Sequence, residues 1–422
     1  MRLNILIINQ FASAPAYNTG AGERHFYIAS KLARQGYDFT IISGGVNHLF
    51  TKNPQTKNLF NEEAIEGGRF IWVRLKRYRH NSFFGRVFSW FEFLFKLYFL
   101  PIDEYKRPNI VLVSSMSLWT AIYAIHIKKR FKIPFILEIR DIWPLTPLQI
   151  GGFSRYNPFI ILFKILEKYS YQKADAIISL MPGFNEHLNS VINNSKPVYW
   201  IPNAIDKGLL GNLSVKKQPD QMRKFTVAYA GALGYANAMD SFIKAAGLLK
   251  EYDIEFLVIG NGPERSNLQK LARNNPKVKF IDKIPKEDVL ELLTNVDAGF
   301  IGWLNLKLYD YGVSANKYND YMLAGIPIIS SSNIQNDPVK MAGCGIQAAA
   351  EDENSIAEAV LKLYSMSPGE RQRLGEIGFK YVMNNNTYDQ IAGQYVNCIE
   401  ETMSQHVGEA EYKTKDIAPA RS

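Results

Sequence analysis

Short apolar runs alternate with longer segments of helical apolar spacing along nearly the whole chain, and this alternation limits the fold more than any other feature. Such short runs are typical of buried parallel strands, and the helical segments are typical of their crossover connections. We expect strands at residues 3–8, 39–43, 110–114, 135–139, 176–179 and 198–201, and again at 225–230, 254–259, 278–281, 298–301 and 326–330. The pattern therefore predicts an α/β protein.

The alternation stops once, at residues 206–223, where glycine, serine, lysine and proline replace both patterns. Because 422 residues exceed what one hydrophobic core usually organises, we expect two Rossmann-like parallel-sheet domains, residues 1–205 and 224–385, joined by this linker. A terminal helix at 386–406 is expected to return to the first domain, and the polar tail at 407–422 to be disordered. Ligands of open parallel sheets bind beyond the carboxyl ends of the strands, which predicts an active site in a central cleft between the domains.

Composition excludes several classes of protein. The two cysteines, Cys344 and Cys398, lie far apart without metal-ligand spacing, so neither a disulfide framework nor a zinc site is expected. No Asp-x-Asp motif occurs and carboxylates do not cluster with histidine or cysteine, so we expect no metal and no cofactor. The formal net charge of +9 favours anionic partners, but no nucleic-acid-binding module accompanies it. A cytoplasmic location is expected, because the first residues resemble a buried strand rather than a signal peptide.

Residues 74–100 combine a cationic cluster with an aromatic helical segment at 82–100. An apolar aromatic face beside basic residues suits a helix lying on an anionic membrane surface, here the inner face of the cell membrane. The alternative is a helix buried in the domain core with Arg86, Glu92 and Lys96 on its solvent side.

Residues 311–329 hold the most informative local pattern. Ser314 is expected to cap a helix that ends at Gly325, and the free N–H groups at its start form an anion site beside Lys317. Asp320 lies three residues after Lys317, so both side chains can face one ligand. A cation, amides and a carboxylate suit the phosphates and ribose of a nucleoside diphosphate. The alternative is a simple cap followed by a solvated Lys–Asp pair.

The sequence Asp-Tyr-Met-x-Ala-Gly-x-Pro at 320–327 resembles the donor-binding motif of the family 4 retaining glycosyltransferases, which have the GT-B fold. The segments at 20–24, 32–37, 201–206 and 259–264 are similar to further family segments in the same order. The resemblance implies that Asp320 binds the donor ribose. The other residues expected on the donor side are Lys317, Asn316, Ser314, Gly231, Gly260, Gly262 and Glu264.

Residues 138–144 and 229–234 resemble a narrower subgroup found in O-antigen and capsule assembly, which includes L-fucosamine (N-acetyl-fucosamine) transferases. This resemblance implies a UDP-sugar donor, a polyprenyl-diphosphate-linked acceptor and transfer with retention of configuration. Two residues of this stretch are expected to be catalytic: Asp141 would orient or deprotonate the acceptor hydroxyl, and Arg140 would hold phosphate. The alternative is an Arg–Asp pair that fixes the loop.

The acceptor side is expected near the first glycine loop, where small residues allow a phosphate to approach the backbone. Its expected members are Gly20, Gly22, Arg24 and His48. His25 is a further candidate there, although a packed histidine is the more ordinary interpretation of either histidine.

The chain departs from the family pattern at three positions. Gly312 replaces an acid, and Ala232 and Asn237 stand where the family usually has an arginine and a lysine for the diphosphate. Lys317, Arg140 and the helix-start amides are candidate replacements for the missing charge. The departures keep two other hypotheses open: a non-catalytic partner with this fold, and a UDP-sugar epimerase of similar architecture.

Overall fold

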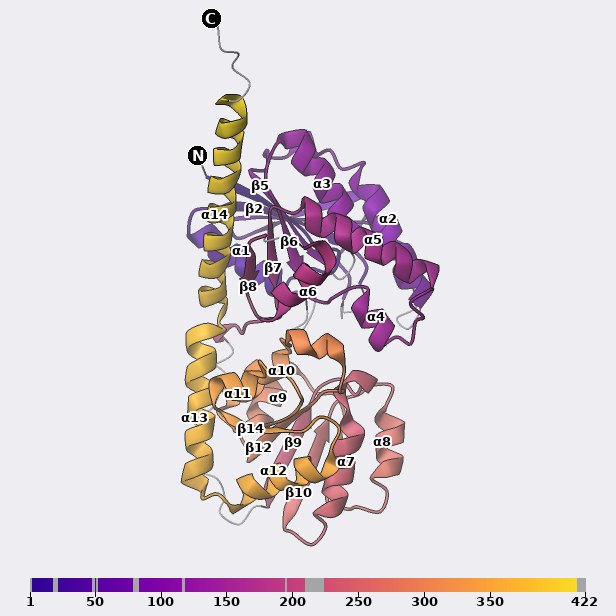
Figure 1. Cartoon of the computed structure of the whole chain (residues 1–422), viewed down its shortest axis with the longest axis vertical. Coiled ribbons are helices and arrows are strands. Elements are labelled where there is room, and N and C mark those ends of the chain that lie inside the picture. Colours follow the sequence, from indigo (N-terminus) through magenta and orange to yellow (C-terminus); the bar gives the residue numbers. More distant parts are fainter. Residues whose placement is uncertain are drawn as a thin grey trace, which may run out of the picture. The chain divides into compact units, whose positions relative to one another are not determined.

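The structure is a computed structural model that describes residues 2–17, 22–47, 50, 52–78, 83–115, 118–193, 196–208 and 224–415. The chain divides into two compact units (Figure 1). Unit 1 comprises Met1–Ile201 and Tyr388–Ser422, and unit 2 comprises Pro202–Thr387. The division falls four residues before the expected linker, and most of that linker lies outside the described residues.

Unit 1 contains an eight-stranded sheet in the order β3-β4-β2-β1-β5-β6-β7-β8, counted over the described part of the chain. Every neighbouring pair is parallel except β3 with β4, which is antiparallel. The strands are β1 (Asn4–Ile8), β2 (Asp38–Gly44), β3 (Phe60–Ile65), β4 (Gly68–Val73), β5 (Ile110–Ser115), β6 (Phe135–Ile139), β7 (Ala176–Ser179) and β8 (Val198–Trp200). Because β1, β6 and β7 are buried at every residue, helices must cover both faces of this sheet.

The helices of unit 1 lie against this sheet and against one another. They are α1 (Arg24–Arg34), α2 (Phe83–Leu97), α3 (Thr120–Phe131), α4 (Leu145–Gln149), α5 (Pro158–Lys173), α6 (Phe184–Ile192) and α14 (Tyr388–Lys415), with the short 3₁₀ helix η1 (Ile102–Glu104). The last helix, α14, packs along α1, where the rings of Tyr27 and Tyr388 stack with centroids 4.6 Å apart. Its length corrects one expectation: residues 407–415 continue the helix instead of starting a disordered tail.

Unit 2 contains a parallel sheet of six strands in the order β11-β10-β9-β12-β13-β14, again within the described residues. The strands are β9 (Phe225–Ala230), β10 (Ile254–Ile259), β11 (Val278–Ile281), β12 (Ala298–Gly302), β13 (Ile328–Ser331) and β14 (Gly345–Ala348). The connecting helices are α7 (Met239–Leu248), α8 (Arg265–Leu271), α9 (Lys286–Leu293), α10 (Asn316–Ala324), α11 (Pro338–Ala342), α12 (Glu353–Ser365) and α13 (Pro368–Asn385), with 3₁₀ turns η3 (Tyr235–Asn237) and η4 (Lys307–Tyr311). Phe242, Phe256 and Phe300 meet at the centre of its core.

The predicted α/β class is confirmed, and each expected strand is present. Three strands were not expected. Strand β3 lies at the edge of its sheet and carries three polar residues in a row, Asn61 to Glu63, so it has no apolar run. Strand β14 has only four residues, and β4 is a largely buried apolar run that pairs with β2. Strand β13 starts two residues later than expected, after Pro327, which has no N–H for the ladder.

Helices α10 and α13 approach closely enough to need a glycine. A Cβ atom added to Gly375 on α13 would lie 1.9 Å from the carbonyl oxygen of Gly325, which ends α10. We therefore expect Gly375→Ala to destabilise the protein by about 2 kcal/mol, because the overpacked helices must move apart. Gly393→Ala on α14 is the matched control: no atom lies within 4 Å of its added Cβ, and a helical Gly→Ala change stabilises by about 0.5–1 kcal/mol. Urea denaturation of both variants checks the pair, and equal stabilities would contradict it.

Candidate functional site

The expected donor residues of unit 2 lie where β9 and β10 end and α10 begins. The loops after β9 and β10 pack backbone against backbone: Gly231 N donates to Ile259 O at 2.9 Å, and Leu233 N donates to Asn261 O at 3.0 Å. A Cβ on Gly260 would lie 1.9 Å from Gly231 O. One on Gly262 would lie 2.3 Å from Leu233 O. Both glycines are therefore required for the contact between the two loops.

Lys317, in the first turn of α10, extends across to the loop that follows β9. Its ammonium Nζ donates to the Tyr229 hydroxyl at 2.7 Å and to Asn237 Oδ1 at 2.6 Å. The same ammonium lies 4.5 Å from the centroid of the Tyr229 ring, within cation–π range. A Cβ on Gly231 would lie 2.2 Å from Lys317 Cε, so the lysine occupies the space that this glycine leaves open.

The electrostatics of this contact follow from its burial. Burial lowers the pKa of Lys317 to about 7, although the negative charge of Asp320 acts in the opposite direction. Burial also raises the pKa of Tyr229, so its hydroxyl stays protonated and donates to Ala232 O at 2.5 Å while accepting from the lysine. An ammonium with a pKa near neutrality is easily charged by an anionic ligand, because the anion favours the protonated form.

The start of α10 differs from the sequence expectation. Ala315 is the N-cap residue and Ser314 makes no capping hydrogen bond, because the Ser314 hydroxyl accepts from Asn203 N at 2.8 Å. Asn316 is exposed and Asp320 is half-buried. The helix ends as expected at Gly325, which has a left-handed φ of 64°.

Glu264 is the N-cap residue of α8 and accepts from Asn267 Nδ2 at 3.1 Å. Gly312, where the family has an acid, has a φ of 98°, a conformation that favours glycine. The structure thus brings Lys317 to Gly231, while Glu264 lies at the start of the helix after the β10 loop.

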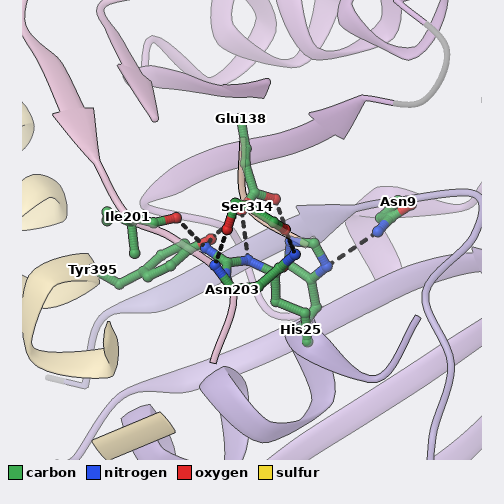
Figure 2. Close-up of polar contacts among 8 residues, drawn as sticks. Asn9, His25, Glu138, Ile201, Asn203, Ser314 and Tyr395 are labelled. Carbon is green, nitrogen blue, oxygen red and sulfur yellow. Dashed lines mark hydrogen bonds and ion pairs between the residues drawn. The ribbon is translucent and has the colours of Figure 1, made fainter. Parts of the chain in front are cut away.

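In unit 1, the predicted catalytic residues follow the carboxyl end of β6. Arg140 is half-buried and Asp141 is exposed. Glu138, two residues before Arg140 in β6, is fully buried and accepts hydrogen bonds from Arg24 Nε at 2.9 Å and from His25 Nε2 at 2.7 Å. Figure 2 shows this carboxylate among its partners.

Arg24 does not fit the acceptor-side role that the sequence predicted. Its side chain is 4% exposed, and besides Glu138 it donates to Ile201 O at 2.9 Å and to the Tyr395 hydroxyl at 3.3 Å. Arg24 therefore joins α1, β6 and α14 within unit 1. Of the other expected acceptor residues, Gly22 has a φ of 84° and would clash with Phe11 O if it carried a Cβ, whereas Gly20 and His48 lie outside the described residues.

His25 is buried as a neutral hydrogen-bonded side chain. Asn9 Nδ2 lies 3.1 Å from His25 Nδ1, and Asn9 Oδ1 accepts from Phe11 N, which orients the amide so that Nδ1 accepts and Nε2 donates to Glu138. Burial lowers the pKa of His25. Burial favours a protonated Glu138, but the hydrogen bond from His25 and the positive charge of Arg24 outweigh it and hold the pKa of Glu138 well below its usual range.

Sequence reasoning did not identify Tyr229, Asn237 and Tyr395 as members of these contacts. Asn237 was noticed only as a departure from the family pattern, and Tyr395 lies on a helix more than 250 residues from its partner Glu138. A tyrosine inside a predicted buried strand, at 225–230, was an available signal, since a buried tyrosine hydroxyl requires a hydrogen-bond partner.

Two parallel-sheet units, each presenting loops at the carboxyl ends of its strands, define the architecture of a GT-B glycosyltransferase. Similar solved structures show the same fold. Sucrose-phosphate synthase from Thermosynechococcus elongatus matches with a TM-score of 0.73 and 15% identity, over 96% of this chain and 100% of that one. WaaG, a glycosyltransferase involved in lipopolysaccharide biosynthesis, matches with a TM-score of 0.64 and 14% identity, over 94% and 99%. A trehalose-6-phosphate structure from E. coli, bound with UDP-2-fluoro glucose, matches with a TM-score of 0.69 and 9% identity, over 94% and 98%.

Family models assign the chain more narrowly. The model for Glycosyltransferase Family 4 matches residues 19–208, and the model for Glycosyl transferases group 1 matches residues 224–366. No curated protein matches the sequence. The chain belongs to the family 4 glycosyltransferases and is a transferase enzyme.

The buried Glu138 network gives a stability prediction. We expect Glu138→Gln to cost about 3 kcal/mol at neutral pH, because Arg24 loses its buried counter-charge. A carboxyl whose folded pKa is below its ordinary value of 4.5 contributes stability above that value and loses it as the pH falls through the folded pKa. The difference in unfolding free energy between wild type and Glu138→Gln should therefore become smaller below pH 4.5. Urea denaturation at several pH values measures this. Glu66→Gln, which breaks the exposed pair with Arg34, is the control and should change nothing measurable.

Proposed function

We propose that this enzyme transfers a sugar, an N-acetylated hexosamine or deoxyhexosamine, from a UDP-sugar to a polyprenyl-diphosphate-linked acceptor with retention of configuration. We propose that this transfer serves O-antigen or capsule assembly, as the resemblance of residues 138–144 and 229–234 to that subgroup suggests. The observation that carries the donor part of this proposal is the Lys317 ammonium, which α10 holds against the glycine loop after β9 with Asp320 one turn further along.

The donor's parts match the groups around α10. The UDP diphosphate leaves with negative charge, which the Lys317 ammonium and the free N–H groups at the start of α10 stabilise. The Asp320 carboxylate accepts hydrogen bonds from the ribose hydroxyl groups. Arg140 and Asp141 act on the acceptor: as the bond from the sugar C1 to the diphosphate oxygen breaks, the acceptor oxygen bonds to C1, and Asp141 receives or orients its proton.

Two apolar helix faces support attachment to the inner face of the cell membrane. Helix α2 buries Trp90, Phe93 and Leu97, whereas its other side exposes phenylalanines, with Phe84 at 84% and Phe95 at 65%. One side of α2 is therefore buried, as the core alternative expects, and its exposed aromatic side is available for contact with lipid, as the membrane alternative expects. Helix α5 lies next to α2, since the rings of Trp90 and Phe163 are 6.2 Å apart.

Helix α5 also exposes apolar side chains between basic ones. Ile161, Leu162 and Ile165 are exposed, and Lys164 and Lys168 lie among them. Exposed aromatic and aliphatic groups beside cations suit the boundary between the headgroups and acyl chains of anionic lipid. Among the helices of the described chain, none combines the length and apolar character that a membrane span requires.

The donor proposal predicts that Asp320→Asn weakens UDP binding by about tenfold or more, because each hydrogen bond to a charged group contributes roughly 1.5–3 kcal/mol. Isothermal titration calorimetry with UDP measures the loss. Asp253→Asn is the matched control. Asp253 is exposed and directly precedes β10, so it lies at the amino ends of the strands, whereas the proposed donor site lies at their carboxyl ends. Equal UDP affinities of wild type and a folded Asp320→Asn variant would remove Asp320 from the donor site.

Turnover separates the proposed transfer from the other two hypotheses. Purified protein is incubated with candidate UDP-sugars, with and without a polyprenyl-diphosphate-linked monosaccharide, and UDP release and sugar products are measured. UDP release that requires the acceptor supports the transferase. Conversion of the UDP-sugar without any acceptor indicates an epimerase, and UDP binding without turnover indicates a non-catalytic partner.

The membrane proposal predicts that Phe84→Glu and Phe95→Glu reduce binding to vesicles containing phosphatidylglycerol, because each places a carboxylate where an exposed ring meets lipid. Vesicle co-sedimentation measures the bound fraction. Ile377→Glu on α13 is the control, since Ile377 is 43% exposed but belongs to unit 2. Unchanged binding of both phenylalanine variants would contradict the role of α2.

A further inference from the structure

We infer that Tyr229 and Asn237 are positioning residues: they hold the Lys317 ammonium at the loop after β9, in the orientation that binds the donor diphosphate. This inference rests on the proposed function of unit 2 as the nucleotide-sugar site. The loop, residues 231–237, contains no basic residue of its own. Lys317 of α10 would supply the positive charge there, and Tyr229 and Asn237 would hold it in place.

Lysine needs such support because its side chain is long and flexible. An unrestrained lysine has about 2 kcal/mol of rotamer entropy to lose when a ligand immobilises it. Here the ammonium is already fixed at 2.7 Å from the Tyr229 hydroxyl and 2.6 Å from Asn237 Oδ1, and it lies near the face of the tyrosine ring. Part of the ordering cost is therefore met before the ligand arrives.

The two acceptors are themselves held in place. The Tyr229 hydroxyl donates to Ala232 O at 2.5 Å, so its remaining lone pairs face the lysine. Asn237 Nδ2 donates to the same carbonyl at 3.1 Å, which turns Oδ1 toward the lysine. Replacing either side chain removes an oxygen whose direction the loop backbone has fixed.

The number of donors on the ammonium leaves a place for the ligand. An ammonium has three N–H donors, and Tyr229 and Asn237 accept two of them. Both acceptors are neutral, so neither cancels the positive charge. The third donor is suited to an anionic oxygen, and a diphosphate supplies one together with the counter-charge.

The burial of the Lys317 ammonium suits a group whose protonation depends on the bound ligand. The pKa of Lys317 falls to about 7 because of burial, with Asp320 of the same helix opposing the shift. Tyr229 from β9, also buried, remains a neutral neighbour. A diphosphate that binds the protonated form should therefore bind less tightly as the pH rises above 7, by up to about tenfold per pH unit.

Gly231 completes the arrangement. Because its added Cβ would lie 2.2 Å from Lys317 Cε, any side chain at this position displaces the lysine from its two acceptors. Gly231→Ala and Lys317→Ala should therefore weaken UDP binding to similar extents, and the double variant should lose little more than either single one.

The experiment compares UDP with uridine, which has the same base and ribose but no phosphate. We expect Tyr229→Phe and Asn237→Ala each to weaken UDP binding about three- to tenfold, and Lys317→Ala more than tenfold, while uridine binding stays within twofold of wild type. Calorimetry measures UDP, and ligand-observed NMR measures the weaker uridine. Tyr235→Phe, an exposed tyrosine in the same loop, is the control and should bind both ligands as wild type does.

Moving the lysine from position 317 to position 237 tests the inference further. Asn237 Oδ1 lies 2.6 Å from Lys317 Nζ, so a lysine at position 237 can reach the space that Lys317→Ala vacates. The double variant Lys317→Ala with Asn237→Lys should regain at least threefold of the lost UDP affinity.

Two results would overturn the inference. In the first, Tyr229→Phe and Asn237→Ala bind UDP as wild type does while Lys317→Ala does not. In the second, these variants lose uridine and UDP affinity equally, as they would through a general disturbance of the unit. Failure of wild-type protein to bind any UDP would overturn the proposed function itself, which distinguishes the two failures.

Discussion

Parallel pairing of the strands is the constraint on which the rest of this structure depends. Each parallel strand needs a crossover to return to the same edge, so every loop that leaves a carboxyl end lies at one side of its sheet. In unit 2 this rule brings the loops after β9 and β10 together, and their backbones touch where Gly260 and Gly262 leave room. Lys317 of α10 then contacts the loop after β9, which packs against the loop after β10.

Sequence patterns predicted most of the architecture because burial in a parallel sheet demands continuous apolar runs, and those runs are visible in the printed residues. Strand β3 was not predicted for the same reason: it lies at the edge of its sheet, none of its residues is fully buried, and its polar residues leave no apolar run. The extent of α14 was also underestimated, because a polar composition suggested disorder where the chain continues as helix to Lys415.

The site was less predictable than the fold. Residue types indicated that Lys317 and Asp320 share a helix face, yet nothing in their spacing indicates that the lysine contacts Tyr229 and Asn237, which lie 88 and 80 residues earlier. Arg24 shows the opposite error. Its place after a glycine loop suggested an acceptor-side role, but Arg24 binds an acid of its own unit, Glu138 in β6, 114 residues away. Long-range pairing of polar groups has no periodicity that a single sequence displays.

The position of Tyr395 has a consequence for how the chain matures. Unit 2 is one continuous segment, Pro202–Thr387, whereas unit 1 is made of Met1–Ile201 and the last helix. Tyr395 donates to Glu138, so the polar cluster inside unit 1 acquires one of its members only after the whole of unit 2 has been synthesised. During translation all of unit 2 therefore leaves the ribosome before the N-terminal part of unit 1 can complete its own interior. The N-terminal part of unit 1 is synthesised first, yet its buried polar cluster is completed last, by Tyr395 of α14.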